Sequence, residues 1–512
     1  MQNLAFYFFV IVNNFYMEKN YFKIGIIGGG VSGLTAGIYL LQNGFDVELY
    51  EKCGVVGGNL TGWHRQGYEI DNCIHWLTGT NPKSPHYKVW KNVGALDRVA
   101  VYYAEAFFTA KYNEQTLSLY KNVEKTRAEM LLISREDERE INYFISAVNS
   151  VINLFNMAGA NNDKSTSFFT KLLSLLNLSR YLNLSAENLA NRFKHPLLKM
   201  VMGGYIQGEF ASLALIVSYA IFASGNGGIP EGGSIEMANN MRRKFEGLGG
   251  KIYTNSAVTG AKIVNGKVES IMIKNKQIVN LDYAIFCTDT LTTYSKILNL
   301  NTPNAYSKGT TFSSFHTALL IDGSSLPFCD ETLLLVKSPY SKFIGKTLTV
   351  KNFPYIKNTV KNGKILIETM FICSQESSLK WVKLRKTNIQ KYIKRKRAIA
   401  KICIKTIEQN FPTLQGKISL LDCWTPASYN RYTGHSGGAY MSNVLKKGQL
   451  PHKTSQKIKG LKNAITASQW NNAPGGLPIA LEQGVLAYKT AKKYHRSNSH
   501  ATQMALKSSF AK

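Results

Sequence analysis

One stretch near the start of the chain, residues 23–51, limits what this sequence can fold into. It reads KIGIIGGGVSGLTAGIYLLQNGFDVELYE. The apolar runs at Lys23–Ile27 and Asp46–Tyr50 predict buried parallel strands, and the apolar spacing over residues 31–41 predicts a helix between them. The stretch therefore predicts a strand, a tight turn, a helix and a second strand, which together form the first unit of a doubly wound α/β fold.

Three glycines in the turn, Gly28, Gly30 and Gly33, form a GxGxxG pattern, and Glu51 ends the second strand. Gly28 permits the tight turn, Gly30 leaves room for a pyrophosphate, and Gly33 lets the helix pack close to the strand. The first turn of the helix presents N–H groups to the phosphates. Glu51, 18 residues after Gly33, is placed to bind ribose hydroxyls. We interpret the stretch as a dinucleotide site, because an ordinary glycine-rich turn does not explain Glu51.

Two further glycine-rich segments fit the same site. The pair Gly57-Gly58 follows the second strand directly. Near the other end of the chain, a predicted strand over residues 461–467 leads to Gly475, Gly476 and Pro478 and then into a helix. A strand, a glycine-rich loop and a helix N-terminus can hold an anion or a polar ring edge. The chain has no second GxGxxG, so the sequence predicts no separate nicotinamide domain.

Composition narrows the choice of partners. The chain has 512 residues, 44% of them hydrophobic, which is enough for a large core and two domains. Its formal net charge of +30 favours anionic surfaces, either membrane or nucleic acid. Because the sequence has no nucleic-acid-binding motif, we expect no nucleic-acid partner and attribute the charge to composition bias together with some affinity for membranes.

Cysteine and histidine usage points to a reducing compartment and to a protein without a metal site. The seven cysteines are scattered and form no CxxC, which argues against a disulfide framework. The nine histidines form no HExxH motif and no ligand cluster. We therefore expect a cytoplasmic protein, with peripheral membrane contact as the alternative.

Two segments are candidates for that membrane contact. The apolar run Leu4–Val12 is too short to span a bilayer and lacks the features of a signal peptide. We expect residues 1–16 to be an extension outside the fold, and a weak membrane anchor is the alternative. Residues 380–407 are strongly basic with an imperfect apolar stripe. They predict either the charged, solvated face of a packed helix or a membrane-surface helix.

The middle of the chain predicts a helix-rich lobe. Ser134 and Asp137 form a capping pattern ahead of a helix to Phe155, and helical segments continue at Phe168–Leu178 and Ala186–Phe193. The very apolar segment Tyr205–Ala223 predicts either a core helix or the wall of a pocket for an apolar substrate. Residues 296–425 alternate strand-like and helical segments, which favours a sheet-plus-helix domain.

Taken together, these pieces resemble the phytoene desaturase, carotenoid isomerase and retinol saturase group of flavin oxidoreductases, within the amine-oxidase-like flavoprotein superfamily. The resemblance covers most of residues 22–492. It rests on GGGVSGLTAG at 28–37, Glu51, the pair at 57–58, GGIPEGGS at 227–234, DYAIFCT at 282–288 and PGGLP at 474–478.

The resemblance implies FAD as the cofactor and an α/β fold, in which a discontinuous Rossmann-like FAD-binding domain carries an inserted α+β substrate domain. The implied FAD-binding segments are residues 17–105, 226–295 and 426–495. The implied substrate domain comprises residues 106–225 and 296–425, and residues 496–512 form a C-terminal tail.

The resemblance also implies roles for individual residues. The implied contacts are Gly28, Gly30 and Gly33 for the pyrophosphate, Glu51 for the adenosine ribose, the backbone of Val258 for adenine, Gly57 and Gly58 for the flavin side, and Gly475, Gly476 and Pro478 for the loop that closes on the flavin. Asn59 departs from the basic residue that follows the glycine pair in many amine oxidases.

The implied activity is hydride transfer between the flavin and an apolar, carotenoid- or retinoid-like substrate, by desaturation, saturation or isomerisation. His75 and His435 are the candidate catalytic residues near the ring, although a lone histidine is more often structural. An amine-oxidase-like oxidase of a polar substrate is one alternative. A carrier of prenylated ligands on the same fold is another, and the intact fingerprint with Glu51 argues against it.

Overall fold

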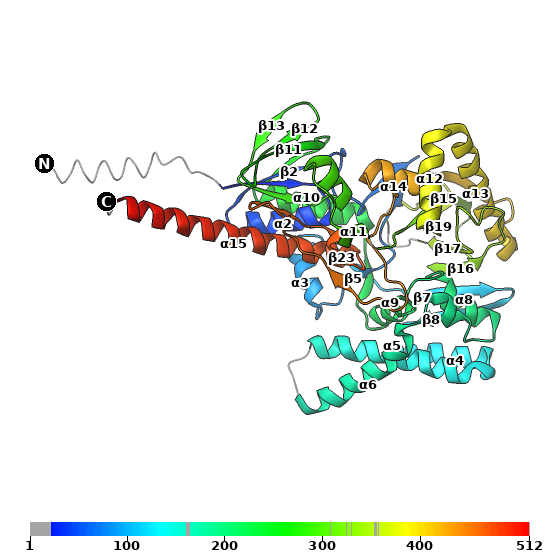
Figure 1. Cartoon of the computed structure of the whole chain (residues 1–512). Helices are drawn as coiled ribbons and strands as arrows, with labels where there is room; N and C mark the ends of the chain where they lie inside the picture. The colour runs from blue at the N-terminus through cyan, green and yellow to red at the C-terminus, as the bar shows by residue number, and fades with distance from the viewer. Residues whose placement is uncertain are drawn as a thin grey trace.

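The computed structural model describes residues 22–510 except 160–163, 308, 324, 329, 353–355 and 357. The expected N-terminal extension, residues 1–16, lies outside the described residues. Figure 1 shows three parts. The first lobe is built around α2, the second is a sheet covered by α12 and α13, and a helical hairpin of α5 and α6 projects from both.

A five-stranded parallel sheet forms the core of the first lobe, with every neighbouring pair parallel. Its strands, in spatial order, are β10 (Lys251–Tyr253), β2 (Asp46–Tyr50), β1 (Lys23–Ile27), β14 (Tyr283–Phe286) and β22 (Ala464–Thr466). The strands predicted over 23–27 and 46–50 are confirmed. The strands come from three segments that lie far apart in the sequence, while the exact domain boundaries stay a prediction.

The two faces of this sheet are covered by different layers. Because side chains alternate along a strand, Tyr283 and Ile285 of β14 face one layer, whereas Ala284 and Phe286 face the other. The first layer is helical: α2 (Val31–Leu41), α10 (Gly233–Gly247) and α15 (Leu477–Phe510). The second layer is an antiparallel sheet: β11 (Val258–Val264), β12 (Lys267–Ile273) and β13 (Ile278–Asn280).

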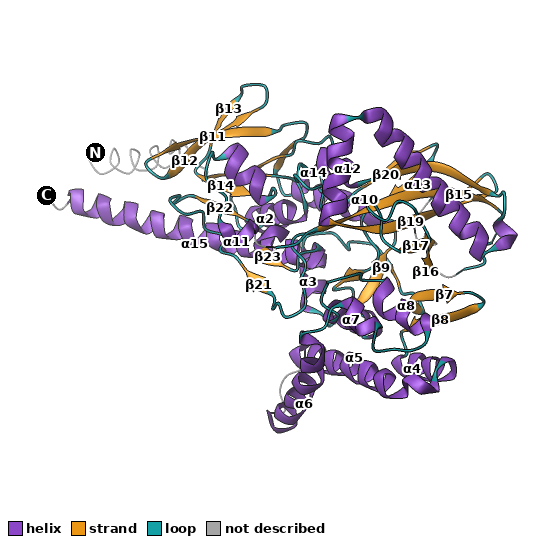
Figure 2. Cartoon of the chain, turned by 45° about the vertical axis from the view of Figure 1, so that its right-hand side comes forward, coloured by secondary structure: helices purple, strands orange, loops and turns teal. Residues whose placement is uncertain are grey.

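An eight-stranded, mostly antiparallel sheet forms the second lobe. Its path runs β20 (Ile418–Trp424), β15 (Phe312–Asp322), β19 (Lys364–Ser374), β17 (Thr347–Asn352), β16 (Glu331–Leu335), β7 (Ala106–Tyr112) and β8 (Gln115–Tyr120), with β18 (Val360–Lys361) beside β19. Helices α12 (Gln375–Thr387) and α13 (Ile389–Asn410) cover one face (Figure 2). The other face packs against a hairpin of the first lobe, β3 (Gly62–Arg65) and β4 (Tyr68–Asp71).

The helix-rich lobe forms as expected, with differences at its boundaries. Its helices are α4 (Val123–Ile133), α5 (Glu138–Gly159), α6 (Lys164–Leu182), α7 (Ala186–Ala190), α8 (Pro196–Gly204) and α9 (Leu213–Ala223). A short 3₁₀ turn, Arg135–Asp137, precedes α5. The apolar segment predicted as one unit over 205–223 is helical only from Leu213, because residues 205–212 form the connection between α8 and α9.

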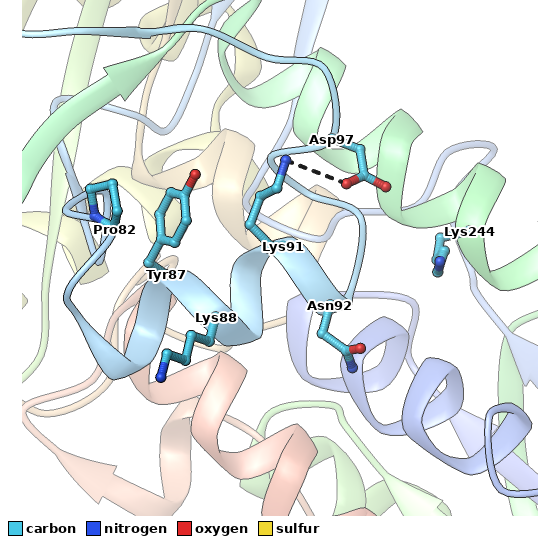
Figure 3. A pocket seen from close by; sticks show the side chains of 7 residues that line it. All are labelled: Pro82, Tyr87, Lys88, Lys91, Asn92, Asp97 and Lys244. Carbon is cyan, nitrogen blue, oxygen red and sulfur yellow. Dashed lines mark ion pairs between the residues drawn. The ribbon is translucent and has the colours of Figure 1, made fainter.

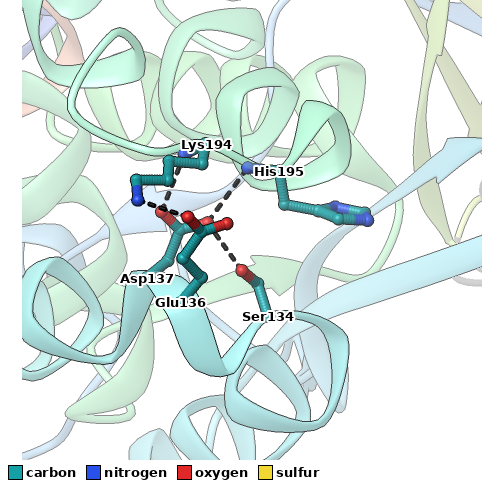
Figure 4. A network of polar contacts seen from close by, with 5 residues as sticks. All are labelled: Ser134, Glu136, Asp137, Lys194 and His195. Atoms are coloured by element: carbon teal, nitrogen blue, oxygen red, sulfur yellow. Dashed lines mark hydrogen bonds and ion pairs between the residues drawn. The ribbon is translucent and has the colours of Figure 1, made fainter.

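The capping pattern predicted at Ser134 and Asp137 does not form, because the Ser134 side chain caps no backbone N–H; Asp137 instead joins two segments (Figure 4). Ser134 Oγ donates to Asp137 Oδ2 at 2.9 Å. The backbone N–H groups of Lys194 and His195 donate to its two carboxylate oxygens at 2.7 and 3.0 Å. Because charged acceptors make strong hydrogen bonds, this carboxylate fixes the start of α5 against the loop that leads into α8.

Short elements join the three parts. They are β5 (Leu77–Thr78), β6 (Val101–Tyr102) and β9 (Gly227–Pro230), which pair with one another; β21 (His452–Lys453) and β23 (Asn472–Ala473), which also pair; the helices α3 (Pro85–Asn92), α11 (Asn304–Ser307) and α14 (Pro426–Thr433); a π-helical turn at Thr292–Ile297; and 3₁₀ turns at Pro412–Leu414 and Gln469–Asn471.

Candidate functional site

The first glycine loop lies where β1 ends and α2 begins. Gly28 has φ of +107°, and its N–H donates to Tyr50 O at 2.9 Å. A Cβ on Gly33 would lie 2.2 Å from Gly28 O, so only glycine fits there. A Cβ on Gly30, by contrast, would meet no described protein atom closer than 3.9 Å. The protein itself therefore leaves space beside Gly30, which is what a bound pyrophosphate requires.

The start of α2 is buried and carries no side-chain cap. Gly30 occupies the N-cap position without a side-chain hydrogen bond, and Val31, Ser32 and Gly33 are all buried. The first N–H groups of a helix have no partner within the helix and need another acceptor when buried. An anion at this position would satisfy them, so the residues present fit a phosphate group.

Glu51 is held at the end of β2 beside the same loop. It is 8% exposed, and its two carboxylate oxygens accept hydrogen bonds from Gly29 N and Cys53 N, each at 2.8 Å. A carboxylate has about four acceptor positions, so acceptor capacity remains for ribose hydroxyls. The side chain is thus oriented by the backbone of the loop that it would serve.

The second glycine pair lies directly against the first loop. Gly57 N donates to Gly29 O at 2.7 Å, and Gly30 and Gly57 form a parallel bridge. Both Gly57 and Gly58 have positive φ, at +109° and +63°. A Cβ on Gly58 would approach Gly30 Cα to 3.2 Å. The structure therefore brings these two predicted segments together.

A chain of hydrogen bonds links the second glycine pair to the glycine loop near the end of the sequence. Asn59 Nδ2 donates to Tyr440 O at 2.7 Å, and Gln469 Nε2 donates to the same oxygen at 3.0 Å. Gln469 Oε1 in turn accepts from Gly476 N at 3.0 Å. Asn59, which departs from the basic residue of many amine oxidases, here connects the two halves of the site.

Helix packing places the two glycine loops at the same end of the lobe. A Cβ on Gly484 of α15 would lie 2.6 Å from Ser32 O of α2, so the two helices touch closely. Further along, the rings of Tyr488 and Tyr39 are 5.6 Å apart. Both helices therefore run side by side in the same direction (Figure 1), and Gly30 and Gly476 each directly precede the N-terminus of one of them.

Val258 lies at the start of β11, close to Glu51 in space. Ser256 N donates to Glu51 O at 2.8 Å, and Asn255 N donates to Cys53 O at 3.0 Å. The segment that leads into Val258 therefore runs beside the end of β2. The contact of the Val258 backbone with adenine stays a prediction, and the position of Val258 beside the end of β2 agrees with that prediction.

Asp289 adds an unsatisfied polar atom at the same edge. It follows β14, is 7% exposed, and its Oδ1 accepts from Thr292 N at 3.2 Å. Its Oδ2 is buried without a hydrogen-bond partner among the described residues. Because buried polar atoms are normally paired, this oxygen marks a place where a ligand donor fits.

The two predicted catalytic histidines lie in different surroundings. His75 Nδ1 is 3.7 Å from Glu331 Oε2, and His75 lines a cavity of about 20 Å³, room for one water-sized group. Burial lowers the pKa of His75, the charge of Lys351 lowers it further, and Glu331 opposes both effects. The cavity wall also includes the aromatic side chains of Trp76, Phe107 and Phe222 and the charged side chains of Asp330, Glu331 and Lys351.

His435 is stacked on an indole and not placed against a charged partner. Its ring lies 4.5 Å from that of Trp470 with the planes 6° apart, and its Nδ1 accepts from Ala439 N at 3.1 Å. Burial lowers the pKa of His435, and Asp289 opposes this. Because one ring nitrogen already serves the backbone, His435 is positioned as a support of the turn before Tyr440.

A cluster of buried charges beside His75 was missed by sequence reasoning. Lys351 on β17 is 5% exposed, Glu368 on β19 is 3% exposed, and Glu331 on β16 is 8% exposed. Glu368 Oε1 accepts from Asp71 N at 3.0 Å. Asp71 Oδ2 accepts from Ser234 N at 2.6 Å. The cluster thus ties the eight-stranded sheet to the first lobe.

These groups have perturbed protonation. Burial lowers the pKa of Lys351, while the carboxylates of Glu331, Glu368 and Asp71 raise it. Burial raises the pKa of Glu368 well above its usual range, and Asp71 adds to the rise. Glu331 Oε1 has no hydrogen-bond partner in the described part of the chain. The sequence signal was a charge inside an apolar strand, as in the ILIETMF run that holds Glu368.

His316 is a second histidine that the sequence did not single out. Its ring stacks on Trp424 at 4.7 Å with planes 6° apart, and its Nε2 lies 2.6 Å from Ser314 Oγ and 3.3 Å from Tyr429 Oη. Burial lowers the pKa of His316 well below its usual value, with the charges of His75 and Lys351 acting in the same direction. It extends the polar cluster along β15.

Another depression lies elsewhere on the surface (Figure 3). It measures about 530 Å³ and is lined by Tyr87, Lys88 and Lys91 of α3 together with Lys244 of α10. Lys91 pairs with Asp97 at 3.7 Å. None of the predicted site residues lines it, so this open surface is separate from the glycine loops.

No group of three or more His, Cys, Asp or Glu in the described ranges is arranged to hold a metal ion. None of the helices described combines the length and the apolar character needed to cross a membrane.

Comparisons of structure define the fold class. A family model described as an NAD(P)-binding Rossmann-like domain matches residues 26–93, which hold the first glycine loop, Glu51 and the second glycine pair. An oxidoreductase from Methanosarcina mazei has a TM-score of 0.57 at 16% identity, covering 91% of this chain and 99% of that one. Putrescine oxidase bound to putrescine has a TM-score of 0.57 at 14% identity, covering 92% and 98%. The predicted α/β fold with a Rossmann-like domain is confirmed.

Comparison of sequence adds a carotenoid-related relative. The chain is 22% identical over 291 residues to 4,4'-diaponeurosporene oxygenase of Staphylococcus aureus. The match covers 54% of this chain and 58% of that protein, so it spans little more than half of the relative. This match confirms the predicted resemblance to a carotenoid-related protein, and the structural neighbours, which include putrescine oxidase, share the fold.

Proposed function

We propose that this chain is an FAD-dependent oxidoreductase that acts on an apolar, unsaturated, isoprenoid-like substrate. The observation that carries the proposal is the hydrogen-bonded chain from Asn59 through Tyr440 O and Gln469 to Gly476. It joins a phosphate-type loop near the start of the sequence to a second glycine loop near its end. An extended FAD molecule would contact both glycine loops, whereas a nicotinamide nucleotide bound at the GxGxxG loop would leave the second loop without a ligand.

The residues of the chain would divide the work of holding the cofactor. Gly28, Gly30 and Gly33, with the start of α2, would bind the pyrophosphate, and Glu51 would accept from ribose hydroxyls. Gly57 and Gly58 would approach the flavin side, and the loop at 475–478 would close over it. When bound, FAD would supply the hydride acceptor or donor. The protein would orient the substrate and exclude water from it.

The aromatic side chains beside His75 favour contact with an apolar group of a substrate. Trp76, Phe107 and Phe222 line the cavity beside His75, and Phe107 and Phe222 belong to the core of the helix-rich lobe. At the polar end, His75 and Glu331 could hold or move a proton at His75 Nδ1. Desaturation, saturation and isomerisation are all compatible with this arrangement.

A polar amine is the second candidate substrate. Glu331 and Asp330 both line the cavity, and carboxylates would attract an ammonium group. Lys351 lines the same cavity and would repel one. Because putrescine oxidase shares the fold, putrescine is included as a second substrate in the experiment below.

The decisive experiment begins with the visible spectrum of the purified chain, which we expect to show bound flavin. Anaerobic addition of a C30 or C40 polyene should bleach the flavin or reoxidise its reduced form, whereas putrescine should not. Bleaching by putrescine alone would favour the amine alternative. A colourless protein that cannot be reconstituted with FAD would reject both and leave the carrier alternative.

Glu51→Ala tests the cofactor assignment directly. Loss of hydrogen bonds to a charged acceptor should weaken FAD binding roughly 10- to 100-fold. The control is Glu246→Ala, since Glu246 lies on the surface of α10, where it pairs with Arg242 at 2.9 Å. Unchanged FAD affinity in Glu51→Ala would contradict the ribose assignment.

A further inference from the structure

Helix α6 directs its leucines away from the protein. Leu172, Leu173, Leu175 and Leu176 are 45%, 60%, 59% and 60% exposed. At about 100° per residue, these four positions form one continuous face of the helix. Exposed apolar residues are ordinary when scattered, but a contiguous group of this kind marks an interaction site.

The opposite side of α6 is the one that packs. Ser174 and Tyr181 are 3% and 1% exposed. Asn177 Nδ2 donates to Ser150 Oγ of α5 at 3.0 Å. A surface helix normally buries its apolar face and exposes its polar one. Along this stretch α6 does the reverse, so its pattern is explained by a contact outside the chain.

The position of α6 leaves this face accessible. In both views the α5–α6 hairpin projects away from the two large sheets (Figures 1 and 2). The hairpin is held to the lobe through α5, whose Ile141, Phe144 and Val148 are fully buried. The leucines of α6 lie on the far side from that core.

The earlier candidate for membrane contact, residues 380–407, is divided between two helices, α12 and α13, and the basic helix α13 does not share this feature. Its Ile399, Cys403 and Ile407 are fully buried against the eight-stranded sheet. The lysines and arginines of α13 are therefore the charged face of a packed helix. Its apolar stripe is used within the fold.

We propose that the leucine face of α6 binds an anionic lipid bilayer surface. Over residues 172–182 the helix has one basic residue, Arg180, and no acidic residue, and the whole chain has a formal net charge of +30. The leucines would enter the boundary between headgroups and acyl chains, and positive charge would attract the headgroups. A second copy of the chain is a poorer occupant, because it would bring another helix of the same charge, in a chain of net charge +30, against this one.

The test is co-sedimentation of the full chain with vesicles of equal parts phosphatidylglycerol and phosphatidylcholine. We expect the wild type to bind them, and to bind phosphatidylcholine vesicles more weakly. The double variant Leu173→Ser/Leu176→Ser should lose at least about tenfold in partitioning, because two exposed leucines no longer enter the bilayer. Both side chains are exposed, so the melting temperature should stay unchanged.

The matched control is Ile278→Ser on β13, at the opposite end of the molecule (Figure 1). Ile278 is 67% exposed, so the change removes a similar apolar side chain without touching α6. It should leave vesicle binding within about twofold. Equal binding by wild type and the α6 variant would overturn the proposal. So would a wild-type dimer in light scattering that the α6 variant dissociates, because a second copy would then cover the face.

Discussion

The glycine loops around Gly30 and the charge cluster around Lys351 are built on opposite principles. The loops are made mainly of backbone: Gly30 leaves space, and the start of α2 supplies N–H groups. The cluster is made of side chains: Lys351, Glu331 and Glu368 are each at least nine-tenths buried on neighbouring strands of the eight-stranded sheet.

The difference concerns how each region tolerates change. The glycine loop can bind a ligand because Gly30 has no side chain. An added side chain would therefore block the ligand without disturbing the fold. A buried charge cluster depends on mutual compensation, so loss of one member leaves the others unpaired in a medium of low polarity. We therefore expect changes in the first region to act on binding and changes in the second to act on stability.

The largest effect is expected for Lys351→Met. The change leaves Glu331, Glu368 and Asp71 without their nearby cation, and breaking a buried pair costs about 3–5 kcal/mol. Denaturant unfolding measures it. The control, Lys262→Met, breaks a surface pair with Glu269 at 2.9 Å and should cost under about 1 kcal/mol. If the two variants lost equal free energy of unfolding, the buried charge cluster would be no more important for stability than a surface ion pair.

The next effect is expected for Gly30→Glu. Its side chain would occupy the space beside the loop and place a negative charge where the pyrophosphate is proposed. FAD affinity should fall at least about a hundredfold, near 2.7 kcal/mol. The melting temperature without FAD should change little, because a Cβ at this position meets no close atom. Gly247→Ala is the control, since nothing lies within 4 Å of its added Cβ. Retained FAD affinity would show that the loop does not hold phosphate.

A smaller effect separates the two histidines. His75→Gln should lower turnover by about tenfold or more with flavin content unchanged, because His75 lies beside the cavity and Glu331. His435→Gln should lower it by less than about threefold, because His435 supports a turn through stacking and a backbone bond. Steady-state rates and visible spectra measure both. The reverse order would make His435 the residue near the reacting atoms.

The smallest effect is a change in pH dependence for His316→Asn. Burial lowers the pKa of His316 well below 6.5, so below pH 6.5 the unfolded chain binds a proton that the folded chain excludes. The wild type therefore loses stability as pH falls through 6.5, by up to about 1.4 kcal/mol per pH unit from this residue. The variant should show a shallower decline in melting temperature between pH 7.5 and 5.5. Parallel declines would show that His316 accepts a proton in the folded state.

The backbone half of the candidate site could be predicted from sequence because it is local. Gly28, Gly30, Gly33 and Glu51 belong to one strand–helix–strand unit, and their spacing carries the geometry. The predicted α/β fold followed from the same unit and is confirmed. Their roles toward FAD stay predictions until a cofactor is measured.

The side-chain half could not be predicted because its members meet only in the folded protein. Glu331, Lys351 and Glu368 lie on three strands whose pairing and register cannot be read from the sequence. Asp71 comes from the other lobe. The link from Asn59 to Gln469 likewise joins residues 410 positions apart through a backbone oxygen. No local spacing encodes such contacts.

The parallel sheet has a consequence for how the protein is made. Its outer strand β22, Ala464–Thr466, leaves the ribosome long after its neighbour β14, Tyr283–Phe286, because the two are far apart in the sequence. Until then the edge of β14 has unpaired backbone groups, and the loop at Gly475 does not yet exist. We expect nascent chains to need chaperone cover and to acquire flavin only after β22 and the loop at Gly475 have left the ribosome, which stalled ribosome complexes supplied with labelled FAD can test.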